Sequence, residues 1–265
     1  MCISLKKHFA TAKRPLEWCI SQYPIREKHV MSLMQDITHK VSLNSDSKIL
    51  EIGAAQGLFL IALKQLGFRN CVGLEPSEDA LNNVSRISKE FNISLDIRKG
   101  FAESIPFESN TFDLMIADSV MEHVKDPKVV LNEVFRALKK GGAFYFSSTS
   151  CLCPYQSEVG LFPFFSWYPN IVKMRVIKWC MKKAPSLIGY TDTPAINWFT
   201  PWKVKRLSEN AGFHSIYDRW NLVDENRFSP IKRTIIRVIR RNAYLKFCAD
   251  LVKSGSAYLL IKEKS

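Results

Sequence analysis

The sequence predicts an α/β fold in which a parallel sheet is covered by helices on both faces. Short apolar strands alternate with longer helical segments from residue 46 to about residue 150. Parallel strands need crossover connections, which helices usually supply, so this alternation is typical of a doubly wound sheet. With 265 residues, of which 46% are hydrophobic, the chain is long enough for one large domain with a sizeable core.

The first half of the chain contains five of the predicted strands. They are expected at 48–52, 71–74, 93–98, 112–117 and 143–147. The helices of this half are expected at 25–41, 57–66, 78–90 and 127–138. Gly67 stands where a helix would end, and Ser77 and Pro127 stand where helices would begin, which are common places for these residue types.

The second half departs from this alternation. Residues 151–200 are rich in aromatic side chains and prolines, which indicates an insertion or lid rather than a second domain. The pattern resumes with a helix over 201–210 and with strands over 213–220 and 256–262. The sequence therefore predicts an α/β fold with a doubly wound, Rossmann-like, seven-stranded sheet and inserted lid segments. The expected organisation is a helical cap at 1–45, a core at 46–150, an aromatic lid at 151–200 and the C-terminal part of the core at 201–265.

Positive charge is concentrated in the second half. The net charge is +13, and residues 151–265 hold 19 lysines and arginines against 8 acidic residues, a net of +11. A basic helical stretch near 230–250 carries Ile231, Ile235 and Val238 at helical spacing among its arginines. A basic amphipathic helix favours a membrane surface, so an anionic membrane is a candidate partner. The alternative is a lid helix packed on the core with its charges in water, and nucleic acid is the less favoured anionic partner.

The cysteines and the apolar runs indicate the cellular location to be expected. Seven cysteines are scattered without a CxxC pair, so neither a zinc site nor a disulfide framework is predicted. No apolar run reaches the roughly 18 residues that a membrane-spanning helix needs, and the first residues lack the apolar stretch of a signal peptide. We expect a cytoplasmic location, with membrane association limited to the surface of the bilayer.

A glycine-rich turn joins the first predicted strand to the helix after it. Gly53 and Gly57 would let a ligand approach the backbone closely. The spacing is not G-x-G-x-x-G, because Ala55 occupies the second glycine position. An acid, Glu51, lies two residues before Gly53, where it would repel a pyrophosphate and suit a cationic amino group. The turn therefore argues against a dinucleotide.

A second acid, Glu75, ends the second predicted strand, 18 residues after Gly57. A carboxylate at that place can accept hydrogen bonds from both hydroxyls of a ribose. Several kinds of nucleoside ligand are bound in this way, so Glu75 does not discriminate among them. The alternative is an ordinary solvated acid at a strand end.

Together these segments resemble the class I S-adenosylmethionine-dependent methyltransferases, especially those that act on small, quinone-like or lipid-like molecules. The resemblance covers residues 46–150 well and residues 195–220 weakly. It rests on six ordered motifs, Leu50-Glu51-Ile52-Gly53 through Gly57, Gly73-Leu74-Glu75-Pro76-Ser77, Gly100 through Phe107, Thr111 through Ile116, Met121-Glu122-His123-Val124 and Leu138-Lys139-Lys140-Gly141-Gly142.

The resemblance implies that S-adenosylmethionine is the cofactor and that residues 46–150 form its binding core. The implied cofactor-binding residues are Glu51, Gly53, Ala54, Gly57, Glu75, Pro76, Phe101, Ala102 and Asp118. Glu51 and the two glycines would hold the methionine end, and Glu75 the ribose. Phe101 and Ala102 would flank the adenine, and Asp118 would line the pocket near the sulfonium. Phe101 stands where many relatives carry an acid, and it would stack on the ring instead.

The catalytic requirement is modest. Methyl transfer from a sulfonium depends chiefly on alignment of the reacting atoms, and a general base helps only where the acceptor must lose a proton. His123 is the candidate base, although a lone histidine is more often structural. Some relatives bind a metal in this stretch, and Glu122 and His123 match them, but Ser119 stands where an acid would be expected. No metal is predicted.

The predicted function is methyl transfer to a small, apolar or amphiphilic acceptor of quinone-like or lipid-like chemistry. The connections at 151–200 and 221–255 are both enlarged and both open on the cofactor side, where they could wall an apolar pocket. Two alternatives remain. Ala55 and Phe101 leave open a non-catalytic protein that keeps the fold, and the basic charge leaves open a methyltransferase of RNA or other nucleic acid. The order Asp118-Ser119-Val120-Met121 lacks the Pro-Pro turn of the enzymes that methylate amino groups of nucleic acids. The oligomeric state is left open.

Overall fold

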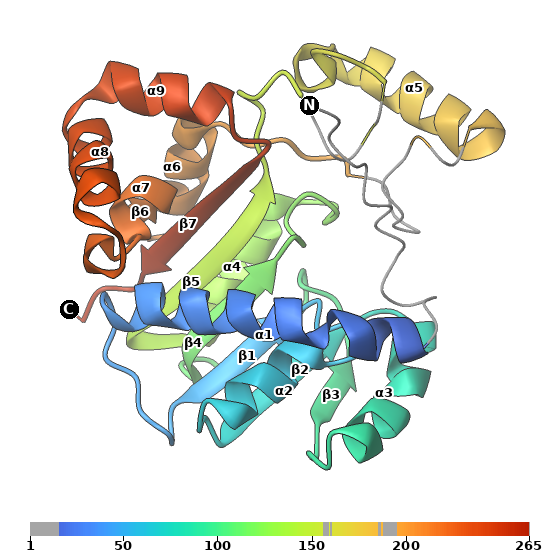
Figure 1. Cartoon of the computed structure of the whole chain (residues 1–265). Helices are drawn as coiled ribbons and strands as arrows, with labels where there is room; N and C mark the ends of the chain where they lie inside the picture. Colours follow the sequence, from blue (N-terminus) through green and yellow to red (C-terminus); the bar gives the residue numbers. More distant parts are fainter. Residues whose placement is uncertain (1–15, 156–158, 160, 185–186, 188–194, 265) are drawn as a thin grey trace.

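The computed structural model describes residues 16–264 except 156–158, 160, 185–186 and 188–194, so part of the predicted cap and part of the predicted lid lie outside it (Figure 1). The described residues form a seven-stranded sheet in the order β3-β2-β1-β4-β5-β7-β6. Its strands are β1 Lys48–Ile52, β2 Asn70–Glu75, β3 Asp96–Lys99, β4 Phe112–Asp118, β5 Leu138–Thr149, β6 Ser215–Asp218 and β7 Gly255–Ile261. Strands β1 to β5 pair in parallel, and β7 is antiparallel to β5 and β6. The predicted Rossmann-like α/β fold is confirmed.

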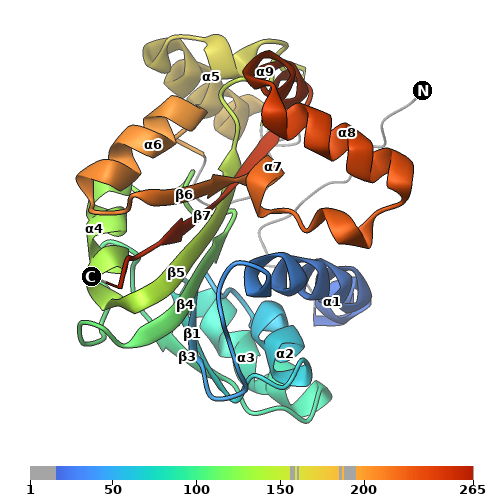
Figure 2. The ribbon, with the colours of Figure 1, turned by 90° about the vertical axis from the view of Figure 1, so that its left-hand side faces the viewer.

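Helices cover both faces of the sheet (Figure 2). One face carries α1 Leu16–Thr38, α2 Leu58–Gln65 and α3 Glu78–Glu90, and the other carries α4 Pro127–Ala137 and α6 Pro201–Asn210. Side chains of a strand alternate between the two faces. Ile49 accordingly joins the core beneath α1, α2 and α3, whereas Leu50 joins the core beneath α4 and α6. Both faces of the parallel sheet are therefore buried.

Helix α1 begins nine residues before its expected start and contains Pro24. Proline lacks the N–H that a helix interior needs, so the sequence favoured a start at Ile25. Cys19 and Tyr23 are buried in the core beneath α1, and the Tyr23 hydroxyl donates a hydrogen bond to Gln65 on α2. Tertiary packing therefore stabilises the turns that precede the proline.

Three strands differ from their expected limits by more than one residue at an end. Strand β5 begins at Leu138 rather than 143, because Leu138 already pairs with Phe112 and the β4–β5 register then shifts between Phe112 and Leu114. Strand β3 covers only Asp96–Lys99. Strand β6 ends at Asp218, whose carboxylate accepts a hydrogen bond from the backbone N–H of Asn221 and so caps helix α7 (Arg219–Leu222).

The described part of residues 151–200 contains the 3-10 helix η2 (Phe165–Trp167) and the helix α5 (Asn170–Lys183). The aromatic composition did not predict α5. It lies beyond the end of β5 rather than on a face of the sheet (Figure 1). This segment has a small core of its own, formed by Val159, Phe165, Ile177, Cys180, Ala195 and Trp198.

The basic stretch near 230–250 is two helices rather than one. Helix α8 (Pro230–Arg241) follows the 3-10 helix η4 (Glu225–Arg227), and α9 (Ala243–Leu251) begins after Asn242. The Asn242 carboxamide accepts hydrogen bonds from the backbone N–H groups of the next helix, which fixes the break. Neither α8 nor α9 has a fully buried residue. Within the described ranges, no helix has the length and apolar character needed to cross a bilayer.

Candidate functional site

Three turns meet at the carboxyl ends of β1, β2 and β4. Strand β1 lies between β2 and β4, so the strand order reverses there, and this is the place where open α/β sheets bind ligands. The backbone N–H groups of Gly53 and Ala54 donate to the Leu74 carbonyl at 2.7 and 3.1 Å. A Cβ added to Gly53 would lie 2.4 Å from the side chain of Val120. The turns after β1 and β4 are therefore too close to admit a side chain at residue 53.

The turn after β1 has a left-handed backbone at Gly53, Ala55 and Gly57, with φ of +74°, +47° and +86°. Glycine adopts this conformation readily, but it costs an ordinary L-residue roughly 1–2 kcal/mol. Ala55 is therefore strained, and its backbone N–H donates to the Glu75 carboxylate at 2.8 Å. Glycine is favoured at residue 57 by its left-handed backbone, and a Cβ there would also lie 2.7 Å from the end of the Leu95 side chain.

Glu51 lies near the end of β1 and is only 5% exposed. Burial raises the pKa of its carboxyl well above the ordinary value, the nearby Asp118 and Glu75 raise it further, and Arg26 partly opposes them. One carboxylate oxygen, Oε2, is buried without a hydrogen-bond partner among the described residues. Buried polar atoms are usually paired, so this oxygen calls for a donor from a ligand. A cationic amino group would supply both the donor and the counter-charge.

Glu75 ends β2 and joins two of the turns. Its two oxygens accept hydrogen bonds from the backbone N–H groups of Ala55 and Ser77 at 2.8 and 2.9 Å. Burial raises the pKa of Glu75, and these two backbone hydrogen bonds partly oppose the rise. A carboxylate offers about four acceptor positions, so Glu75 keeps acceptor capacity for the hydroxyls of a ribose.

Asp118, at the end of β4, is held by groups from two other elements. Ser147 on β5 donates to it at 2.5 Å, and Arg26 and His29 on α1 lie 2.8 and 3.3 Å from its Oδ2. Burial alone would raise the pKa of Asp118, but His29, Arg26 and Ser147 together hold it well below the ordinary value. Asp118 is therefore a carboxylate at neutral pH. The sequence did not identify Arg26 or His29 as site residues, because 92 residues separate Arg26 from Asp118.

The other predicted residues lie at the same edge of the sheet. The backbone N–H of Gly100 donates to the Glu75 carbonyl, which places Phe101 and Ala102 beside β2. Ala102 is buried, whereas Phe101 is 58% exposed. Pro76 is exposed and Ala54 is buried. His123 is half-buried in the turn after β4, and its backbone N–H donates to the carbonyl of Val120. No group of three potential metal-binding side chains occurs within the described ranges.

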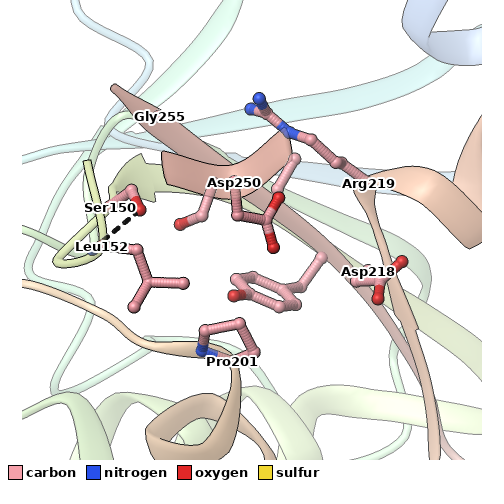
Figure 3. A pocket seen from close by; sticks show the side chains of 10 residues that line it. Ser150, Leu152, Pro201, Asp218, Arg219, Asp250 and Gly255 are labelled. Atoms are coloured by element: carbon pink, nitrogen blue, oxygen red, sulfur yellow. Dashed lines mark hydrogen bonds between the residues drawn. The ribbon is translucent and has the colours of Figure 1, made fainter. Parts of the chain in front are cut away.

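Two pockets lie outside these turns. The pocket in Figure 3 is formed by the start of β7 and the segments around Ser150, Pro201 and Asp250, and its volume of about 10 Å³ admits about one water molecule. A cleft of about 530 Å³ opens between Val41, Asp113, Gly141 and Lys262, at the start of β4 and the opposite end of the parallel strands. Neither is a suitable acceptor pocket, since the first is too small and the second is at the wrong end.

Comparison with known proteins agrees with this geometry. A family model described as a methyltransferase domain matches residues 26–217. An uncharacterized methyltransferase of Schizosaccharomyces pombe is 30% identical over 211 residues, which are 75% of this chain and 70% of that protein. A ubiquinone biosynthesis O-methyltransferase of Colwellia psychrerythraea is 30% identical over 104 residues, which are 39% of this chain and 42% of that enzyme. The chain spans 60% or less of the length of several curated relatives.

Solved structures share the fold. A SAM-dependent methyltransferase of Thermotoga maritima, described as a possible histamine N-methyltransferase, superposes with a TM-score of 0.52 at 17% identity, covering 96% of this chain and 98% of that one. Together with the methyltransferase-domain match, the fold and the three strand-end turns define a class I S-adenosylmethionine-dependent methyltransferase, with S-adenosylmethionine as its cofactor. The chain belongs to the methyltransferase-domain family. The residues present fit the cofactor, since the orphaned Glu51 oxygen suits its amino group.

Proposed function

We propose that the protein transfers a methyl group from S-adenosylmethionine to a small, apolar or amphiphilic acceptor of quinone-like or lipid-like chemistry. The observation that carries the transfer is the buried Glu51 carboxylate, which has one unpartnered oxygen at the switch point of the sheet. When bound, the cofactor supplies an electrophilic methyl group on a sulfonium.

Each residue of the site has a proposed part. Glu51 binds the amino group, while Gly53, Ala54 and Gly57 let the backbone approach the methionine end. Glu75 accepts the ribose hydroxyls, with Pro76 holding the turn that follows. Ala102 and the exposed ring of Phe101 bracket the adenine.

Asp118 and His123 are the site residues proposed to act near the methyl group that is transferred. Asp118 provides a fixed negative charge near the reacting atoms, held in place by Arg26, His29 and Ser147. His123 acts as a general base where the acceptor must lose a proton, and His29 is the second candidate because Asp118 orients its ring.

The apolar nature of the acceptor is supported by the segment beyond β5. Leu161, Trp167 and Ile171 are large apolar side chains that stay well exposed around the small core of this segment. Exposed apolar groups on the segment that follows β5 favour an apolar ligand. The relatives named as ubiquinone biosynthesis O-methyltransferases support the same chemistry, and the matches cover 39% and 47% of this chain.

The test is a methyl-transfer assay with radiolabelled cofactor. Apolar catechols, amphiphilic amines and fatty acids are offered beside a total RNA preparation, with Glu51→Gln as the site control. We expect label in a small acceptor from wild type and little from the variant. Label in RNA would favour the nucleic-acid alternative. Cofactor binding without transfer to any class would favour a non-catalytic protein that keeps the fold.

We also propose that helices α8 and α9 rest on an anionic membrane surface on the cytoplasmic side, close to an amphiphilic acceptor. Ile231, Ile235 and Val238 form a stripe along α8 that is 75%, 53% and 49% exposed. Lys232 and Arg241 are exposed on the same helix, so the stripe has positive charge beside it. Apolar exposure together with basic charge complements anionic headgroups.

Vesicle sedimentation tests this contact. Arg240 is unsuited to the test because it donates to Glu225 and to the carbonyls of Trp220 and Val223, and so holds α8 in place. The double variant Lys232→Glu/Arg241→Glu leaves those contacts intact. Each basic residue contributes about 1 kcal/mol near an anionic surface, so we expect binding to phosphatidylglycerol vesicles to weaken at least about 30-fold. Lys89→Glu is the matched control, and equal binding by all three proteins would overturn the proposal.

A further inference from the structure

A lysine occupies a core position in the segment beyond β5. The inner face of α5 is formed by Lys173, Ile177 and Cys180, at the spacing of a buried helical stripe. Lys173 is only 4% exposed. Its ammonium lies over the ring of Trp198, 4.3 Å from the centroid. Within the described ranges it has neither a carboxylate partner nor a hydrogen-bond acceptor. Lysine is rarely buried without a partner, so this position needs an explanation.

Two further donors lie beside it. The indole N–H of Trp198, a residue 6% exposed, is buried without an acceptor among the described residues. The ammonium of Lys203 donates to the Trp198 carbonyl at 3.1 Å and lies 4.9 Å from the ring centroid of Phe199. Burial lowers the pKa of both lysines, the nearby Cys151 partly opposes this in each case, and the charge of Lys203 lowers the pKa of Lys173 further. The cluster is therefore rich in donors and positive charge.

The cluster belongs to the edge of the sheet that carries the cofactor site. The residue before Trp198, Asn197, donates from its backbone to the Glu122 carbonyl and from its side chain to the Val124 carbonyl. Both carbonyls belong to the turn that follows Asp118 at the end of β4. The backbone carbonyl of Asn197 accepts a hydrogen bond from the Thr149 hydroxyl at the end of β5. Trp198 is thus anchored where β4 and β5 end.

We propose that Lys173, Lys203 and the indole N–H of Trp198 bind an anionic headgroup, a phosphate or a carboxylate, on the methyl acceptor. An anion would supply the acceptors that the two buried donors lack among the described residues, and a counter-charge for the two ammonium groups, which have no carboxylate partner there. The proposal rests on the proposed function in one respect, the assignment of the headgroup to the methyl acceptor.

Calorimetric titration with n-octyl phosphate and with octanoate tests the site, and octylammonium serves as the probe of opposite charge. We expect wild type to bind an anionic probe, and the stronger of the two identifies the headgroup. Lys173→Met should weaken that binding at least about tenfold, as the loss of a hydrogen bond to a charged group does. Lys178→Met is the matched control, since it removes one exposed lysine from the same helix and should bind like wild type.

A second variant distinguishes loss of the anion site from misfolding of the protein. Trp198→Phe keeps a ring beneath Lys173 but removes the N–H, and should weaken binding by about two- to tenfold. The melting temperature and the affinity for S-adenosylhomocysteine are measured for every variant and should stay unchanged. Absence of anion binding to wild type, or equal binding by wild type and Lys173→Met, would overturn the anion site. Anion binding by a protein that fails to bind S-adenosylhomocysteine would leave the site standing and overturn the proposed function.

Discussion

The substitution Glu51→Gln separates the ligand-binding role of Glu51 from its effect on stability. In the empty protein the carboxylate is buried with one unpartnered oxygen. The neutral amide removes the cost of ionising a carboxyl whose pKa burial raises well above its ordinary value. The variant should therefore be more stable than wild type at pH values above that raised pKa when no ligand is present. It should also bind S-adenosylmethionine more weakly by about 1.5–3 kcal/mol, which is roughly 10- to 150-fold, because a charge-assisted hydrogen bond is lost.

The pH dependence follows from the raised pKa of Glu51. A carboxyl whose folded pKa lies above its unfolded value binds its proton more tightly in the folded state. The stability that this gives is fully present below the ordinary pKa of a glutamate and is lost as the pH rises through the raised value. Cofactor affinity changes in the opposite sense, because the amino group binds the ionised carboxylate. Affinity should rise with pH through the raised pKa and fall above about pH 8, where an amino group loses its proton.

The assay combines thermal unfolding of the empty protein with calorimetric titration across pH. Wild type should release a proton on binding at low pH, seen as a dependence of the heat on the buffer, and Glu51→Gln should not. Glu90→Gln, an exposed acid on α3, is the control and should change neither property. A Glu51→Gln protein that is less stable than wild type, or that keeps wild-type affinity, would refute the reasoning.

Three further outcomes are expected. Ala55→Gly should raise the free energy of unfolding by about 1 kcal/mol in a urea titration, because it relieves a left-handed alanine; a loss of stability would contradict the strain. His123→Ala should remove the acid limb of the pH profile of kcat/KM and lower kcat/KM by about 10²- to 10⁴-fold for a hydroxyl acceptor. If His123→Ala keeps the acid limb and His29→Ala loses it, His29 is the base. Arg240→Ala should destabilise the protein by about 2 kcal/mol through the loss of its hydrogen bonds to Glu225 and two backbone carbonyls. The control Arg241→Ala should change the free energy of unfolding by less than about 0.5 kcal/mol. Equal effects of the two substitutions would contradict the structural role of Arg240.

The core elements were predictable because local patterns determine them. The helix expected at 78–90 has those limits in the structure, with Ser77 as its N-cap, and the strand expected at 48–52 is β1. Short apolar runs that end in glycine or acid identify buried parallel strands without knowledge of their neighbours. The carboxyl ends of such strands meet at one edge, so the sequence also placed Glu51, Glu75 and Asp118 together.

The remaining features depend on contacts between distant parts of the chain. Arg26 and His29 reach Asp118 only because α1 packs across the sheet edge, and nothing in the local sequence indicates that contact. Tertiary packing likewise overrides Pro24 in α1. The local sequence does not distinguish Lys173 from the other lysines of residues 170–183, and only the fold shows that it lies on the inner face of α5.

The measurement that tests the central claim most directly is calorimetric titration of the purified protein with S-adenosylmethionine and S-adenosylhomocysteine, beside Glu75→Ala and Glu75→Gln. Glu75 also ties Ala55 and Ser77 together, so the melting temperature of each variant is recorded. Wild type should bind both ligands with a Kd on the order of micromolar, Glu75→Ala should lose binding, and Glu75→Gln should retain part of it. Absence of binding to wild type would contradict the assignment of this edge of the sheet as a cofactor site.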